Sequence, residues 1–310
     1  MSVPGSGLPD VLLQALGGTS PSDREVRRLF HGRGGCTPSW RHLVVDWYPP
    51  LLHIISYADP GEPVIRELLS QIPGHVEAVL LQRRDLADTP MTLLRGELPQ
   101  EIFAVEDGLR YALFFDRDRN VGFFPDMRVG RRLVRERAAE RRILNLFAYT
   151  CGFSVAAIAG GASQVVNLDM NRNLLQVGRD NHRLNGHDLR RCSFLSHDLF
   201  KSFGKLRRIG PFDLVIIDPP GEQGESFQPH RHWPKLLQRL PELLAPEGEI
   251  LAAVSSPHLG RRFLANQFET SLPTADLVES YTAGDDFPEN DPDKGLHLLW
   301  FRNRNRNRNP

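Results

Sequence analysis

The second half of the chain alternates short apolar strands with helical segments, and this alternation constrains the fold more than any other feature. Strands that read as continuous apolar runs are buried on both faces, which is typical of a parallel sheet covered by helices. The pattern predicts strands over residues 143–147, 164–168, 192–196, 212–217 and 248–254, and helices over residues 128–139, 154–159, 172–185, 232–244 and 259–268. We therefore expect an α/β fold with a mainly parallel, doubly wound sheet. A last strand over residues 297–302 is expected to close one edge in the antiparallel direction.

The first half predicts a smaller α+β domain. Helices are expected over residues 9–16 and 23–30, before a strand–strand–helix–strand–strand pattern. The members of that pattern are residues 42–47, 51–57, 62–71, 76–82 and 101–106, with a hairpin of residues 110–116 and 120–124. The predicted boundaries are a helical and loop segment over 1–40, an α+β domain over 41–126, the doubly wound domain over 127–302 and a solvated tail over 303–310.

Composition excludes several classes of protein. The 38 basic and 38 acidic side chains of the 310 residues cancel, which argues against a protein that coats nucleic acid by bulk electrostatics. Only four basic residues are lysine; the 34 arginines fit phosphate recognition, although a GC-rich genome explains them as well. Three scattered cysteines are too few for a disulfide framework or a zinc site, so no metal is expected. No apolar run approaches the ~18 residues of a membrane span, and the N-terminus lacks a signal-peptide pattern, so we expect a soluble cytoplasmic protein.

A strand that turns into a helix near residue 152 is the strongest local signal. Ligands of an open parallel sheet bind outside the carboxyl ends of the strands, near the first strand–helix turn. Gly152 would let the backbone approach such a ligand closely. The G-x-G-x-x-G pattern of a dinucleotide site is missing, which argues against a nicotinamide cofactor.

Three acidic residues end three consecutive predicted strands. Asp169 follows the second strand and could accept both hydroxyl protons of a ribose. Asp198 follows the third and could accept from an adenine amino group, and Asp218 follows the fourth. Together they describe a nucleoside pocket whose ligand need not carry phosphate. The alternative for each aspartate is to cap the helix that follows, because Asp is favoured at that position.

The segment Asp218-Pro219-Pro220 is the most discriminating piece of this pattern. Two prolines remove two backbone donors and fix φ, so rigid carbonyls remain beside the Asp218 carboxylate. A set that only accepts hydrogen bonds can hold an amino group or a planar base.

The motifs NLFAYTCGFSVAAIAGGA, VVNLDMNRNLL, DNHRLNG and FDLVIIDPP occur in that order. With the upstream segment VGFFPDMRVGRRLV, they resemble the class I S-adenosylmethionine-dependent methyltransferases, and more narrowly the bacterial 23S ribosomal RNA large-subunit methyltransferase I and K/L group. The resemblance covers about residues 42–302 and implies a Rossmann-like methyltransferase domain, S-adenosylmethionine as the cofactor and RNA as the partner. It places the cofactor at Asn145, Phe147, Tyr149, Gly152, Asp169, Met170, Asp198 and Asp218. It places the methyl acceptor at Asp218, Pro219 and Pro220, with Asp126 and Arg128 bordering the cleft.

The chain departs from that group in ways that bear on the reaction. Residues 1–40 are too short for the RNA-binding PUA domain that some members carry, and no cysteine lies near residue 257 or near Asp218. Carbon-5 of cytosine is a poor nucleophile until a thiolate adds to carbon-6, so cytosine-C5 transfer is disfavoured. Cys151 and Cys192 are expected to be small packing residues. A ring nitrogen with its own lone pair needs no such nucleophile, so we rank N-methylation of RNA first.

Arginines concentrate between residues 117 and 142, a segment that contains nine arginines and four acidic residues. Arg128, Arg131, Arg132 and Arg135 recur at helical spacing on one face, as a phosphate-contacting strip or as an ordinary solvated face. After Asp218, the segment containing His230 and Trp233 offers a cation and an aromatic ring on which a base could stack.

Two other classes of function remain open from the residues alone. One is a methyltransferase for a small molecule or a protein, and the other is a non-catalytic nucleotide-binding module. The resemblance suggests a homodimer.

Overall fold

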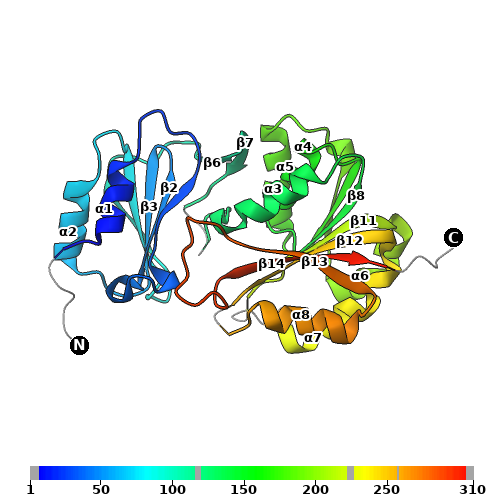
Figure 1. The fold of residues 1–310 in the computed structure, drawn as a ribbon. Coiled ribbons are helices and arrows are strands. Elements are labelled where there is room, and N and C mark those ends of the chain that lie inside the picture. Colours follow the sequence, from blue (N-terminus) through cyan, green and yellow to red (C-terminus); the bar gives the residue numbers. More distant parts are fainter. Residues whose placement is uncertain (1–6, 116–119, 222–226, 257, 305–310) are drawn as a thin grey trace. The chain divides into compact units, whose positions relative to one another are not determined.

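The computed structural model describes residues 7–115, 120–221, 227–256 and 258–304 (Figure 1). The described chain forms two compact units. Unit 1 contains the residues up to Pro125 together with Gly284–Pro292, and unit 2 contains Asp126–Ala283 and the residues from Asp293 onward. A short return segment between the last two strands of unit 2 therefore belongs to unit 1.

Unit 1 is built on a five-stranded sheet in sequential order, in which only the third and fourth strands run parallel. The strands are β1 (Arg27–His31), β2 (Leu43–Tyr48), β3 (Leu51–Ser56), β4 (Ala78–Arg83) and β5 (Met91–Arg95). Helices α1 (Asp10–Gly17) and α2 (Glu62–Gln71) bury Leu12, Leu16 and Leu68 in one core with the strands. A separate hairpin pairs β6 (Phe103–Glu106) with β7 (Leu109–Ala112), and two 3₁₀ turns are η1 (Gly32–Gly34) and η2 (Pro38–Trp40).

Two predictions for unit 1 are wrong in detail, and one strand was missed. The helix expected over 23–30 is instead a loop and strand β1, which pairs antiparallel with β2. Strand β5 was not predicted, because its half-exposed residues lack an apolar alternation. The strand expected over 110–116 is β7, which forms its hairpin with β6 and not with residues 120–124. Beyond the end of β7, a single backbone hydrogen bond from Phe114 N to Val121 O (3.1 Å) connects the two segments that were expected to pair.

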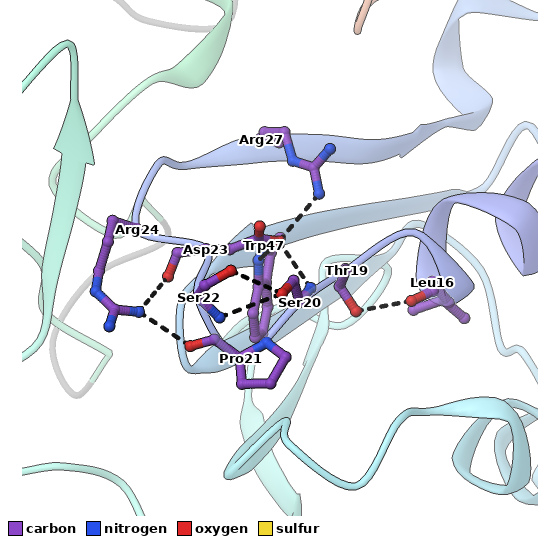
Figure 2. A network of polar contacts seen from close by, with 9 residues as sticks. All are labelled: Leu16, Thr19, Ser20, Pro21, Ser22, Asp23, Arg24, Arg27 and Trp47. Carbon is purple, nitrogen blue, oxygen red and sulfur yellow. Dashed lines mark hydrogen bonds and ion pairs between the residues drawn. The ribbon is translucent and has the colours of Figure 1, made fainter.

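A polar network explains why the chain before β1 is not helical (Figure 2). Oδ2 of Asp23 accepts hydrogen bonds from Ser20 N at 3.0 Å, Arg27 Nη2 at 3.2 Å and Trp47 Nε1 at 3.3 Å. One carboxylate thereby joins the loop, β1 and β2. Aspartate that bonds nearby backbone in this way favours turns over helix interiors.

Unit 2 contains a seven-stranded sheet in the order β10-β9-β8-β11-β12-β14-β13, in which β14 runs opposite to the other six strands. The strands are β8 (Arg142–Leu146), β9 (Gln164–Asp169), β10 (Cys192–Ser196), β11 (Phe212–Ile217), β12 (Leu244–Ser255), β13 (Ala275–Thr282) and β14 (Leu296–Asn303). The predicted doubly wound α/β fold is confirmed.

Helices cover both faces of this sheet. One face carries α3 (Arg128–Glu136), α4 (Gly152–Ala159) and α5 (Arg172–Leu184), and the other carries α6 (Leu199–Ile209), α7 (Pro229–Arg239) and α8 (Arg261–Ser271) (Figure 1). The 3₁₀ turns are η3 (Pro125–Met127), η4 (Leu189–Arg191) and η5 (Leu240–Glu242). In the part of the chain that the structure describes, no helix is long and apolar enough to cross a membrane.

Two elements of unit 2 were missed from the sequence. Helix α6 follows β10 directly, and strand β13 forms the sheet edge that β14 was expected to close. The expectation for β14 was right in direction and wrong in position. Strand β13 is largely exposed and carries a bulge at Leu277/Glu279, so it lacks the apolar run that reveals a buried strand.

Candidate functional site

The candidate site lies where the strand order of unit 2 reverses. Strands β9 and β10 lie on one side of β8, and β11 lies on the other. The loop after β8 and the segment after β11 therefore flank the switch point of the sheet, where ligands of such folds bind. Asp169, Asp198 and Asp218 all lie at this carboxyl edge, as predicted.

The loop after β8 has an unusual backbone. Phe147, Tyr149 and Cys151 have positive φ angles of 56°, 48° and 61° although none of them is glycine. Such conformations cost ~1–3 kcal/mol each and persist only where the surroundings impose them. Here Tyr149 N donates to Asp169 Oδ2 (2.9 Å), and Cys151 N donates to Ala148 O (2.7 Å).

Asp169 therefore positions the loop as well as ending a strand. Its second oxygen, Oδ1, accepts from Asn171 N at 2.8 Å. A carboxylate offers about four lone-pair sites, so both oxygens can accept further hydrogen bonds. Beside it, the side chain of Met170 is 63% exposed, which places an apolar surface next to the carboxylate.

Gly152 begins helix α4 and faces Arg131. A Cβ atom added at Gly152 would lie 3.6 Å from Arg131 Cδ and 3.9 Å from its Nη1, which is ordinary contact. The described protein therefore has room for a larger residue at position 152. A need for glycine at this position would come from a ligand.

Asp198 caps the next helix. Its Oδ1 accepts from Lys201 N at 3.0 Å, the geometry of an N-cap at the start of α6. The helix-capping alternative that the sequence left open for this aspartate is therefore present in the structure.

Asp218 has an unusual electrostatic environment. Burial and, to a smaller extent, the Asp126 carboxylate raise its pKa, Arg131 lowers it, and the net result is a pKa of about 7. Arg131 is only 4% exposed. Asp126 and the buried Arg131 are therefore the charged residues that act on Asp218. Pro219 is half-buried, and Pro220 is exposed.

Asn145 does not reach the strand end. It is 1% exposed, and its Nδ2 donates to Asn167 Oδ1 at 3.0 Å. Asn167 Nδ2 donates to Ser154 Oγ (3.0 Å), which lies 2.9 Å from His182 Nε2. This buried polar chain links β8, β9, α4 and α5 beneath the loop. Asn145, Asn167 and Ser154 stand within apolar runs, and no sequence signal indicated that they pair with one another.

The predicted base-stacking role of Trp233 is wrong. Residues 229–239 form helix α7, and Trp233 is 1% exposed, with its ring 5.9 Å from that of Phe227 in the core. His230 remains exposed and lies edge-on to Phe263 at 4.9 Å.

The arginine strip of α3 is also different from the prediction. Arg131 is buried, Arg128 and Arg135 are half-buried, and Arg132 is exposed, so these residues do not form a continuous solvent-facing strip. The remaining arginines of the cluster have structural partners where the structure describes them. Arg137 pairs with Glu279 (2.6 Å), Arg141 with Glu249 (2.5 Å), and Arg142 donates to the carbonyl of Ile209.

The two cysteines of unit 2 are poor nucleophiles. Cys151 is fully buried, and burial raises the pKa of its thiol well above the usual value. Burial also raises the pKa of Cys192 to about 12. Because the thiolate is the reactive form, neither side chain is prepared for covalent catalysis.

Comparisons with known proteins agree with this geometry. A family model described as S-adenosylmethionine-dependent methyltransferase matches residues 27–302. The chain is 29% identical over 264 residues to the ribosomal RNA large subunit methyltransferase I of Aeromonas salmonicida, which covers 79% of this chain and 66% of that protein. It is 37% identical over 138 residues to the protein of the same name from Klebsiella pneumoniae, covering 44% and 34% of the two chains. The chain thus spans about two thirds or less of these relatives.

Solved structures share the fold. A putative methyltransferase, SMU.776, crystallised with SAH, superposes with a TM-score of 0.82 at 22% identity, over 94% of this chain and 80% of that one. A tRNA m1G37 methyltransferase from M. jannaschii superposes with a TM-score of 0.59 at 16% identity, over 84% and 71% of the two chains.

Proposed function

This chain belongs to the family of S-adenosylmethionine-dependent methyltransferases, and from that premise we propose that it transfers a methyl group to a base nitrogen of RNA, with ribosomal RNA as the first candidate. The observation that carries the proposal is the set of acceptors at the sheet switch point, Asp169 and Asp218, without a reactive thiol among the described residues beside them.

The described residues fit the family's cofactor. Asp169 holds lone pairs toward the edge where a ribose would lie, and the exposed Met170 offers an apolar surface to an adenine ring. The strained loop ties the backbone of Tyr149 to Asp169, and Gly152 leaves room beside Arg131. When bound, the cofactor supplies an activated methyl group on a sulfonium centre.

Asp218, Pro219 and Pro220 would hold the methyl acceptor. The carboxylate and the carbonyls of this rigid segment accept hydrogen bonds from a base and orient its ring. A ring nitrogen then needs alignment and no covalent activation, and alignment alone can contribute ~7–11 kcal/mol. The unreactive Cys151 and Cys192 support this chemistry over cytosine-C5 transfer, which stays the alternative within RNA.

RNA as the substrate is supported by the relatives, which are named ribosomal RNA large subunit methyltransferases. A small-molecule or protein substrate is the competing proposal, because the alignments cover only part of those relatives. Homodimer formation stays a prediction.

The decisive experiment incubates the purified chain with isotopically labelled S-adenosylmethionine and RNA from a deletion strain, followed by nucleoside mass spectrometry. We expect label in an N-methylated nucleoside. Label in 5-methylcytosine would replace the N-methyl assignment, and RNA without label would favour the small-molecule or protein substrate. The Asp218→Ala variant should lose methyl transfer while its cofactor affinity, measured by calorimetry, falls much less. Equal loss of both would remove Asp218 from the acceptor side.

A further inference from the structure

Lysine is rare in this chain, and its placement is uneven. Three of the four lysines, Lys201, Lys205 and Lys235, lie on the two helices α6 and α7, while the chain holds 34 arginines. All three side chains are exposed. Codon bias explains an excess of arginine, but it does not explain why the few lysines gather on two helices.

These lysines form one surface with neighbouring arginines. Lys201, Lys205 and Arg208 are spaced at i, i+4 and i+7 on α6, opposite its buried face. Arg231 and Lys235 are spaced at i and i+4 on α7, on the side of the helix opposite the buried Trp233. We call these five cations the α6–α7 surface.

The two helices pack side by side. The rings of Phe200 and His232 lie 5.1 Å apart, and the guanidinium of Arg239 lies 4.0 Å from the centre of the Phe203 ring. Helix α6 spans ~10 Å between its first lysine and Arg208, by the 1.5 Å rise per residue. The surface therefore extends across two adjacent helices.

The charge of this surface is not neutralised by described carboxylates. Neither α6 nor α7 contains an acidic residue. Nζ of Lys205 lies 3.0 Å from His197 Nε2, and the nearby Glu242 pairs with Arg207 (3.9 Å) and Arg239 (3.1 Å), which are not members of the surface. In the described part of the chain, no carboxylate forms an ion pair with any of the five cations.

The position of the surface relates it to the candidate site. The N-terminal ends of α6 and α7 lie at the carboxyl edge of the sheet, because α6 follows Asp198 and α7 follows the segment after Asp218. The cations thus begin beside the site and continue along the helices away from it. This contrasts with α3, where Arg131 is buried beneath the site.

We propose that the α6–α7 surface binds the phosphate backbone of the RNA whose base enters the site. The inference rests on the proposed function and names the contact surface for its substrate. Exposed lysines are compact charges suited to phosphates, and ion contacts along a strand position it without reading its sequence. A protein partner is less suited, because a protein interface has an apolar centre and no large hydrophobic side chain of α6 or α7 is strongly exposed.

The test removes charge from the surface and compares it with equal removal elsewhere. The variant is Lys201→Gln, Lys205→Gln and Lys235→Gln together. The control is Arg66→Gln, Arg183→Gln and Arg190→Gln, three exposed residues on α2, α5 and η4 that lower the net charge by the same amount. Filter binding measures the Kd for deproteinised ribosomal RNA from the deletion strain over a range of salt concentrations, and calorimetry measures the Kd for S-adenosylmethionine.

For the surface variant we expect the slope of log Kd against log salt to fall by ~2, since each phosphate contact to a single strand contributes ~0.7. At ~100 mM salt this corresponds to roughly 100-fold weaker RNA binding. Cofactor affinity should be unchanged, and the control should bind RNA like the wild type.

Three results would overturn the proposal. The first is unchanged RNA binding by the surface variant, and the second is an equal loss of RNA affinity in the control variant. The third is a surface variant that keeps its RNA affinity but no longer binds a polyglutamate peptide, which would assign the surface to an acidic protein. If the wild type methylates RNA while the surface variant binds it normally, only this inference fails. If the wild type labels no RNA, the proposed function fails.

Discussion

At the level of single residues, Asp218 carries the most distinctive property of the molecule. Burial and the Asp126 carboxylate hold its pKa at about 7. The folded protein therefore retains a proton that the unfolded chain releases near pH 4, and ionisation of Asp218 destabilises the fold progressively between pH 4 and pH 7. The destabilisation is complete above pH 7.

Replacing Asp218 by Asn should therefore stabilise the protein at pH 8. We expect a gain of ~1–3 kcal/mol in the free energy of unfolding, below the ~4 kcal/mol that a shift of this size allows. The gain should shrink at pH 5. Urea unfolding of the variant and the wild type at both pH values checks this, and an equal gain at both would contradict a titrating Asp218. Methyl transfer by the wild type should rise with pH around 7 if the carboxylate form holds the acceptor.

Gly152 offers a prediction that separates ligand from fold. Because an added Cβ would only touch Arg131, Gly152→Ala should change the free energy of unfolding by less than ~0.5 kcal/mol. If the cofactor lies against this residue, its Kd should increase ~10-fold, which is a loss of ~1.4 kcal/mol. Thermal unfolding and calorimetry measure the two effects. Unchanged cofactor affinity would show that the ligand does not approach this backbone.

At the level of elements, the loop after β8 depends on a close approach by helix α5. A Cβ added at Gly178 would lie 2.3 Å from Sγ of Cys151 and 2.8 Å from its Cβ, so no larger residue fits there without movement of the loop. The loop with three positive φ angles is therefore held by Asp169 on one side and by the α5 glycine on the other.

Gly178→Ala should destabilise the protein by ~1–3 kcal/mol, the usual cost of overpacking. Gly204 is a matched control, because it lies inside α6 with nothing within 4 Å of an added Cβ, and Gly204→Ala should stabilise by ~0.5–1 kcal/mol. Cys151→Gly should partly rescue Gly178→Ala, since it removes both clashing atoms and glycine tolerates φ of 61°. Denaturant unfolding of the four variants gives the comparison, and no rescue would mean that the strain lies elsewhere.

The helices and strands differ in how well the sequence predicts them. Strands β8, β9 and β11 were predicted nearly to their ends, because buried parallel strands are nearly continuous apolar runs. Strand β13 was not, because an exposed edge strand has no such run. The sequence predicts a helix where the short strand β1 lies, because pairing with β2, a tertiary contact, decides the conformation of this segment.

At the level of the whole molecule, three histidines link stability to pH; His53 and His182 are buried, and His31 is half-buried. Burial lowers the pKa of His31 and His53 to about 4 and that of His182 to about 3. For His31 the neutral state fits its contacts, because Nδ1 accepts from Arg28 Nη1 (3.1 Å) and Nε2 donates to Glu289 Oε1 (3.2 Å). Glu289 lies in the segment Gly284–Pro292 of unit 1, so His31 connects two parts of unit 1 that are distant in the sequence.

A lowered histidine pKa means that, between pH 6.5 and pH 4, the unfolded chain binds protons that the folded chain does not bind. Stability should therefore be highest above pH 6.5 with respect to these groups and fall as the pH decreases toward 4. We expect a loss of ~1–2 kcal/mol per histidine between pH 7.5 and pH 5. Urea unfolding at the two pH values measures the total, and His53→Leu should reduce the dependence. Because Asp218 changes the stability in the opposite direction over this range, the difference between the two proteins is the test, and an equal pH dependence of wild type and His53→Leu would contradict a buried neutral His53.

The sequence by itself determined the doubly wound fold, the acids at the strand ends and the family resemblance, because these depend on apolar periodicity and on residues adjacent in the chain. Only the tertiary structure decided which polar residues are available for binding. It buried Arg131 and Trp233, joined Asn145 to a hidden polar chain, and left the lysines of α6 and α7 exposed. The physical reason is that exposure and pKa depend on what packs against a side chain, and those neighbours come from segments far apart in the sequence.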